Sequence, residues 1–140
     1  MKRIIIPWGV ILLIISMALV TYAKMEKVAI SKDNLAELKG NWTGDRGVGP
    51  GDTRNTDLEI ANDTLPVQGK FVFYDVRGAG GGGKTVTFDF KGKINQQGNL
   101  LVVGGNTKIE LSLYKDDGKM KLEGNYFWYE TKGTMSFKKK

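Results

Sequence analysis

The sequence contains no cysteine and no histidine. Without them, serine or cysteine triads and the common zinc sites are excluded in their usual form. The absence of cysteine also means that no disulfide can hold the fold together, so the chain must be stabilised by its core alone. Small exported domains of animals generally use disulfides, and their absence favours a bacterial source.

The chain also lacks a concentrated region of one charge. Its 21 basic and 15 acidic residues give a formal net charge of +6, which falls to +4 without Lys2 and Arg3. The excess is spread along the chain, and the single lysine run, at residues 138–140, is typical of a solvated tail. Nucleic-acid binding is therefore disfavoured.

The N-terminus has the pattern of an export signal. Lys2 and Arg3 precede an apolar run, and Ala23 offers a small residue for cleavage, so we predict a signal peptide at residues 1–23. An uncleaved anchor spanning residues 4–22 is the alternative. Either way the remainder is exported, as a periplasmic, secreted or membrane-anchored domain, because the positive charges stay inside. No cysteine follows the apolar run, which excludes a lipid attachment there.

Apolar and polar residues alternate through most of the remaining chain. Apolar and polar residues alternate over 87–91, over 108–113 and, apart from Phe127, over 119–128, which places these apolar side chains on one face of a strand. A leader segment at 24–39 contains the one predicted helix, which Gly40 ends. Beyond it we predict a single domain at 40–140, built of strands joined by short links. The eight expected strands lie near residues 38–44, 56–61, 67–76, 85–94, 100–103, 107–114, 119–129 and 133–138.

Eight consecutive strands without a crossover helix predict an all-β fold. The expected architecture is an antiparallel up-and-down barrel, which removes exposed strand edges, and a β-sandwich is the alternative. Residues 45–55 are rich in glycine and are expected to form a loop. Between the last two long strands, Leu113 and Met120 must both stay on the core face. This requirement allows either a two-residue turn at Asp117-Gly118 or a four-residue loop at 115–118.

A helical turn that leads into Gly40-Asn41-Trp42 on the first strand, followed by an eight-strand meander, resembles the calycin superfamily of lipocalins and avidins. The resemblance implies that Gly40 permits a close backbone approach and that Trp42 closes one end of a barrel. Lipocalins also pack a late arginine on this tryptophan. In this chain the last arginine is Arg77, so that partner is missing, and the biotin-contacting residues of avidins are not recognisable either.

The segment from Gly78 to Thr85 matches the phosphate-loop pattern G-x-x-x-x-G-K-[ST]. That chemistry needs a helix immediately afterwards, whose N-terminus binds the phosphates. The following residues, 86–90, alternate as a strand. We therefore interpret the match as a glycine-rich hairpin loop at the mouth of the barrel, with no nucleotide and no other cofactor or metal.

Aromatic side chains are the remaining candidates for function. Our leading hypothesis is a non-enzymatic binding protein that holds a small apolar or amphipathic ligand inside the barrel, entered beside residues 45–55 and 77–84. Its site would use the inward aromatic residues Trp42, Phe88, Phe90, Tyr126 and Trp128. The alternative is a protein-interaction module, an inhibitor or envelope assembly factor, with an outer patch of Tyr74, Phe127 and Tyr129. An enzyme is the third and least favoured class, because no carboxylate pair has an informative spacing.

Overall fold

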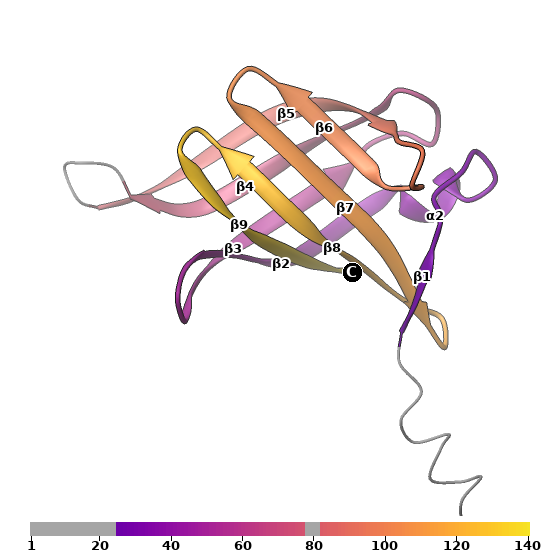
Figure 1. The fold of residues 1–140 in the computed structure, drawn as a ribbon, viewed down its shortest axis with the longest axis horizontal. Helices are drawn as coiled ribbons and strands as arrows, with labels where there is room; N and C mark the ends of the chain where they lie inside the picture. The colour runs from indigo at the N-terminus through magenta and orange to yellow at the C-terminus, as the bar shows by residue number, and fades with distance from the viewer. Residues whose placement is uncertain (1–24, 78–81) are drawn as a thin grey trace, which may run out of the picture.

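The computed structural model describes residues 25–77 and 82–140. Within these ranges the chain forms one short helix and nine strands (Figure 1). In chain order they are β1 (Glu26–Val28), α2 (Leu35–Leu38), β2 (Gly40–Gly49), β3 (Asp52–Ile60), β4 (Val67–Arg77), β5 (Gly83–Ile94), β6 (Leu100–Gly104), β7 (Thr107–Asp116), β8 (Lys119–Trp128) and β9 (Thr131–Lys139). The predicted signal peptide at 1–23 lies outside the described residues.

Strands β2 to β9 form a closed antiparallel barrel. Each strand pairs with the next one along the chain, and β9 pairs with β2 to close the ring. The predicted eight-strand up-and-down barrel is therefore confirmed, and the sandwich alternative is wrong. Closure leaves no free edge within the ring, which is the physical advantage of this architecture.

The leader segment contributes a strand that the sequence analysis missed. β1 pairs with β7 at Leu113–Lys115, just beyond the stretch of β7 that pairs with β6. It thus covers a part of the β7 backbone that the shorter β6 leaves exposed. Three residues are too few to show an alternating pattern, which is why no strand was predicted there.

Alternation along the strands sends one set of side chains into the barrel. Leu58, Phe71, Leu111, Leu122 and Phe137 are each at most 1% exposed. Some inward positions must be glycine because neighbouring strands approach closely. A Cβ atom at Gly124 would lie 1.8 Å from the Glu110 carbonyl oxygen, so no side chain fits there.

The β7–β8 and β2–β3 hairpins test two predictions made from the sequence, the length of the turn near Asp117 and the loop at 45–55. Asp116 pairs with Lys119, so the turn between β7 and β8 has the two residues Asp117 and Gly118, with φ angles of 44° and 79°. This confirms the two-residue alternative. The predicted loop at 45–55 is wrong, because β2 and β3 continue almost to the turn and pair from Gly40 to Gly49.

The two ends of the barrel differ (Figure 1). At the helix end, Leu38 of α2 is fully buried and its carbonyl oxygen accepts a hydrogen bond of 2.9 Å from Trp42 Nε1. Lys139 Nζ lies 5.9 Å from the centroid of the Trp42 ring. At the opposite end, which we call the turn end, lie the β2–β3, β6–β7 and β8–β9 turns and the connection between β4 and β5.

Candidate functional site

The five side chains predicted to line a pocket all belong to the inner face of the barrel. Trp42, Phe90 and Tyr126 are at most 6% exposed, whereas Phe88 and Trp128 are partly buried against the core. Trp42 lies toward the helix end. Phe88 on β5 and Trp128 on β8 lie toward the turn end.

These rings pack on two further aromatic residues, Phe71 and Phe73 of β4. Phe73 has its ring centroid 5.1 Å from that of Phe88 and 5.2 Å from that of Trp128. The ring centroids of Phe71 and Phe90 are 4.9 Å apart. Phe71 and Phe73 are both fully buried. The predicted lining is thus a packed aromatic core, and the turn end is where this core meets solvent.

A hollow of about 180 Å³ opens at the turn end beside Trp128. Three of the four arginines in the sequence line it. We call it the arginine hollow, and its lining residues are Arg46, Val48, Arg54, Asp75, Val76, Arg77, Tyr126, Trp128 and Thr131.

The hairpin of β2 and β3 brings two of these arginines together. Arg46 and Arg54 are direct cross-strand partners in the register, so both side chains project from the same face of the sheet. Arg46 has the parity of buried Trp42, and Arg54 that of buried Leu58, so this shared face is the inner one. Placing like charges directly opposite each other is destabilising unless other groups compensate.

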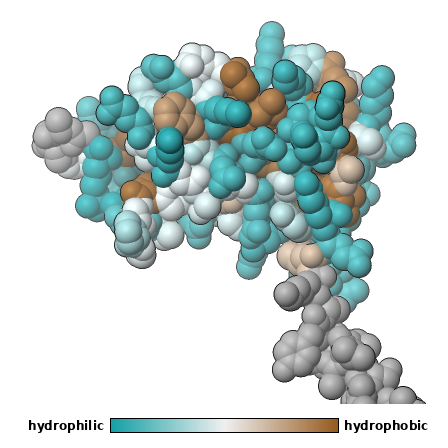
Figure 2. Space-filling view, in the orientation of Figure 1, coloured by the Kyte–Doolittle hydropathy of each residue, from teal (hydrophilic) through white to brown (hydrophobic). Residues whose placement is uncertain are grey.

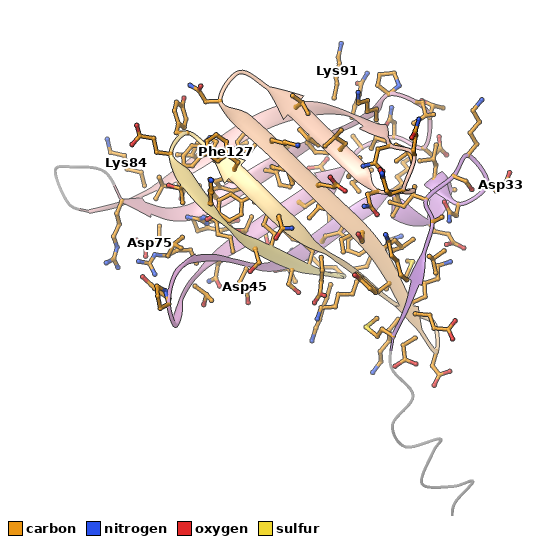
Figure 3. The ribbon with its side chains drawn as sticks, viewed as in Figure 1. Asp33, Asp45, Asp75, Lys84, Lys91 and Phe127 are labelled. Carbon is orange, nitrogen blue, oxygen red and sulfur yellow. The ribbon has the colours of Figure 1, made fainter. Side chains whose placement is uncertain are left out.

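A bulge in β4 brings the compensating carboxylate. The pairing of β4 with β5 shifts between Phe73 and Val76, and Asp75 within the shift has a φ of 53°. Its carboxylate lies 3.0 Å from Arg54 Nε and 3.3 Å from Arg77 Nη2. The bulge also turns Val76 inward toward the core, whereas simple alternation puts it on the outer face with Tyr74. Figure 3 shows Asp75 at the turn end, far from Asp33 beside α2.

Arg46 is held by neutral acceptors instead of carboxylates. Its Nη1 donates to the Asn55 carbonyl oxygen and to Thr56 Oγ1, both at 3.0 Å, and its Nη2 donates to the Tyr74 carbonyl oxygen at 2.8 Å. Its guanidinium carbon lies 4.8 Å from the centroid of the Phe73 ring. Arg46 is only 3% exposed, and burial lowers its pKa from the ordinary value. An arginine nevertheless remains charged at any physiological pH.

Tyr126 completes the wall of the arginine hollow. Its hydroxyl donates to the Gly47 carbonyl oxygen at 2.7 Å. Burial raises the pKa of this phenol, and the nearby charge of Arg46 partly opposes the shift. Tyr126 is therefore a neutral hydrogen-bonding group at physiological pH.

The arginine hollow was missed because residues 45–55 were assigned to a loop. A signal was present, since Arg46 and Arg54 lie at equal distances from Pro50 in a segment with glycines at its centre. Treating that centre as a hairpin turn places the two arginines opposite each other. The contribution of Asp75 depends on the bulge, which no local pattern predicts.

The three residues of the predicted outer patch do not come together. Phe127 on β8 and Tyr129, immediately after this strand, are 38% and 60% exposed. Tyr74 is on β4, four strands away in either direction around the ring, and its hydroxyl donates to Asp57. Val103, 61% exposed, lies much closer to Phe127, because Lys108 pairs with both residues. We therefore define the outer patch as Val103 and Phe127, together with Tyr129 at the rim of the barrel, where its ring packs edge-on against Trp128 with the centroids 5.2 Å apart.

Basic side chains separate the apolar members of the outer patch. One cross-strand row on the outer surface runs from Val103 through Lys108 and Phe127 to Lys132. Lys132 Nζ lies 5.8 Å from the centroid of the Phe127 ring. A shallow hollow of about 550 Å³ adjoins this row, lined by Lys108, Phe127, Lys132 and their neighbours. On this side of the barrel apolar and hydrophilic areas alternate (Figure 2).

Other kinds of site find no support in the described residues. Lys84 and Thr85 of the phosphate-loop pattern begin β5, so a strand and not a helix follows, whereas residues 78–81 lie outside the described part. No group of three or more carboxylates in residues 25–77 and 82–140 is arranged to hold a metal ion. Within the same ranges, no helix has the length and apolar character required to cross a membrane.

Comparison of the chain with protein-family models, with curated proteins and with solved structures finds no match.

Proposed function

We propose that this chain is an exported, non-enzymatic interaction module that binds a partner protein through the outer patch. One observation supports this choice over a ligand carrier. The inner aromatic side chains pack on one another, whereas Val103 and Phe127 on the outer surface and Tyr129 at the rim remain exposed. Exposed aromatic groups in a cluster are typical of binding surfaces.

The row of side chains also indicates the chemistry of the partner. Lys108 and Lys132 flank Phe127 on both neighbouring strands. A complementary surface would have an apolar pocket for Phe127 with carboxylates on either side. Buried aromatic anchors provide most of the affinity in such contacts, and the charged rim mainly sets specificity and association rate.

The test is capture of a partner from envelope extract by immobilised protein and by single variants. Phe127→Ala and Tyr129→Ala should each reduce the affinity by about tenfold or more, as expected for interface aromatic residues. Tyr74→Ala is the matched control, because it removes a tyrosine from the opposite side of the barrel. A partner that all three variants retain equally would contradict the proposal.

A small apolar or amphipathic ligand remains a second candidate. The observation in its favour is that Phe88 and Trp128 are only partly buried where the core meets the turn end. Native mass spectrometry of protein purified from its own host tests it. A bound mass that Trp128→Ala removes would support a ligand, and a bare chain in both cases would exclude it.

A further inference from the structure

We propose that the arginine hollow binds a small organic carboxylate. This site is separate from the outer patch and does not depend on the function proposed above. Three features carry the inference: the charge balance of the hollow, the unused donors of Arg46, and the size and character of its walls.

The lining of the hollow has a net positive charge, although like charges so close together repel each other. Arg46, Arg54 and Arg77 line the hollow with a single carboxylate, Asp75. Asp52 also pairs with Arg54 from outside it. Among the described residues, Arg46 is the one arginine without a carboxylate within 4.0 Å. Two arginines in direct cross-strand register repel each other, so an additional anion between them would be stabilised.

Arg46 also has donors to spare. A guanidinium carries five N–H groups, and the hydrogen bonds to Asn55, Thr56 and Tyr74 use three of them. Its Nε–H and one Nη2–H make no hydrogen bond within the described residues. No fully buried side-chain nitrogen or oxygen there lacks a partner, so Nε is within reach of solvent. A buried charge is expensive unless it is paired and hydrogen-bonded. A planar carboxylate provides two acceptor oxygens that match the fork of a guanidinium.

The walls favour an organic anion over an inorganic one. Val48, Val76 and Trp128 line the hollow beside the arginines, so a ligand meets apolar surface as well as charge. Its volume of about 180 Å³ accommodates a small acid. It is below the range of about 300–1,000 Å³ that is usual for drug-sized ligands, so a long acyl chain does not fit.

The hollow is accessible without rearrangement of the barrel. The side chain of Arg77 is 63% exposed and that of Asp75 is 41% exposed, so the rim is in contact with solvent. Arg54 is more enclosed, with 15% of its side chain exposed. Arg77 is thus suited to attract the anion, and Arg46 to hold it at the base.

The experiment measures binding of benzoate, acetate and inorganic phosphate to the mature exported protein at constant ionic strength. The readouts are tryptophan fluorescence, since Trp128 lines the hollow, and the thermal midpoint. Benzoate should bind most tightly, change the fluorescence and raise the midpoint. Phosphate binding as tight as that of benzoate would overturn the assignment to an organic carboxylate, and no response to any of the three would overturn the site itself.

Two variants and a control test which residues bind the ligand. Arg46→Lys should weaken benzoate binding by about tenfold or more, because an ammonium cannot reproduce the fork. Arg77→Ala should weaken it even if Arg46→Lys does not fold. Lys91→Ala is the matched control, since it removes an equal charge from an exposed position away from the hollow (Figure 3). Equal losses in Arg77→Ala and Lys91→Ala would show only a general effect of net charge and would contradict the proposal.

Discussion

Truncation of Phe73 tests whether the barrel interior is a packed core. Phe73 is fully buried. The centroid of its ring lies 5.1 Å from that of Phe88, 5.2 Å from that of Trp128 and 4.8 Å from the guanidinium carbon of Arg46. Phe→Ala changes at such positions cost about 3–5 kcal/mol, since they remove buried area and leave a cavity. We expect Phe73→Ala to lose this amount of unfolding free energy.

The loss is large enough to measure by urea unfolding. Domains of this size have a total stability of about 5–15 kcal/mol and lose about 1–3 kcal/mol per molar urea. The midpoint of Phe73→Ala, followed by tryptophan fluorescence and circular dichroism, should therefore fall by about 1–5 M. If this variant does not fold, Phe73→Leu should show a smaller loss with the fold retained.

Phe127→Ala is the matched control, because it removes the same side chain from the outer surface, where Phe127 is 38% exposed. Surface substitutions usually change stability by less than about 0.5 kcal/mol, although the contact with Lys132 adds a little here. Equal losses in the two variants would refute the packed core. The interior would then be a cavity, and the ligand-carrier hypothesis would regain its support.

Three further predictions concern a turn, a carboxylate and the glycine-rich segment. Gly118→Val should destabilise by about 1–3 kcal/mol in urea unfolding, because φ is +79° there and no neighbour obstructs a Cβ. Gly104→Val is the control, because Gly104 is in equally open space without a positive φ and its replacement should cost less stability. Equal losses of stability in the two variants would contradict the assigned turn. A hydrogen bond from Asn99 lowers the pKa of Glu110, so its contribution to stability is present above the ordinary carboxyl pKa and is lost as pH falls through the lowered value. Glu110→Gln should therefore reduce the acid dependence of the thermal midpoint, and an unchanged slope would exclude this role. Lys84→Ala should leave stability and any response to ATP unaltered, whereas ATP protection that only the wild type shows would establish a nucleotide site.

The alternation of apolar and polar residues was enough to predict the barrel, because each inward apolar residue marks the core face of its own strand. The strands of residues 107–128 show this most clearly. Ile109, Leu111, Leu113 and Leu122 point inward, and parity together with Asp117-Gly118 restricted the turn to two choices. Local sequence was sufficient here because the register is fixed by residues close to one another along the chain.

The candidate sites depend on features that alternation does not contain. Arg46 is a charged residue at an inward position, so it breaks the pattern that identifies a strand, and glycines around it indicate a loop. The inward turn of Val76 depends on one extra residue in β4. The outer patch depends on which strands are neighbours, and for this reason Tyr74 was grouped with Phe127 although β4 and β8 lie on opposite sides of the ring.

Both ends of the folded chain lie at the helix end of the barrel. β1 enters beside the Asp117-Gly118 turn, and the Lys140 backbone N–H donates to the Asn41 carbonyl oxygen. A fusion at either end therefore attaches opposite the arginine hollow and the outer patch. If residues 4–22 anchored the chain in a membrane, both candidate surfaces would lie at the end of the barrel opposite the attachment point.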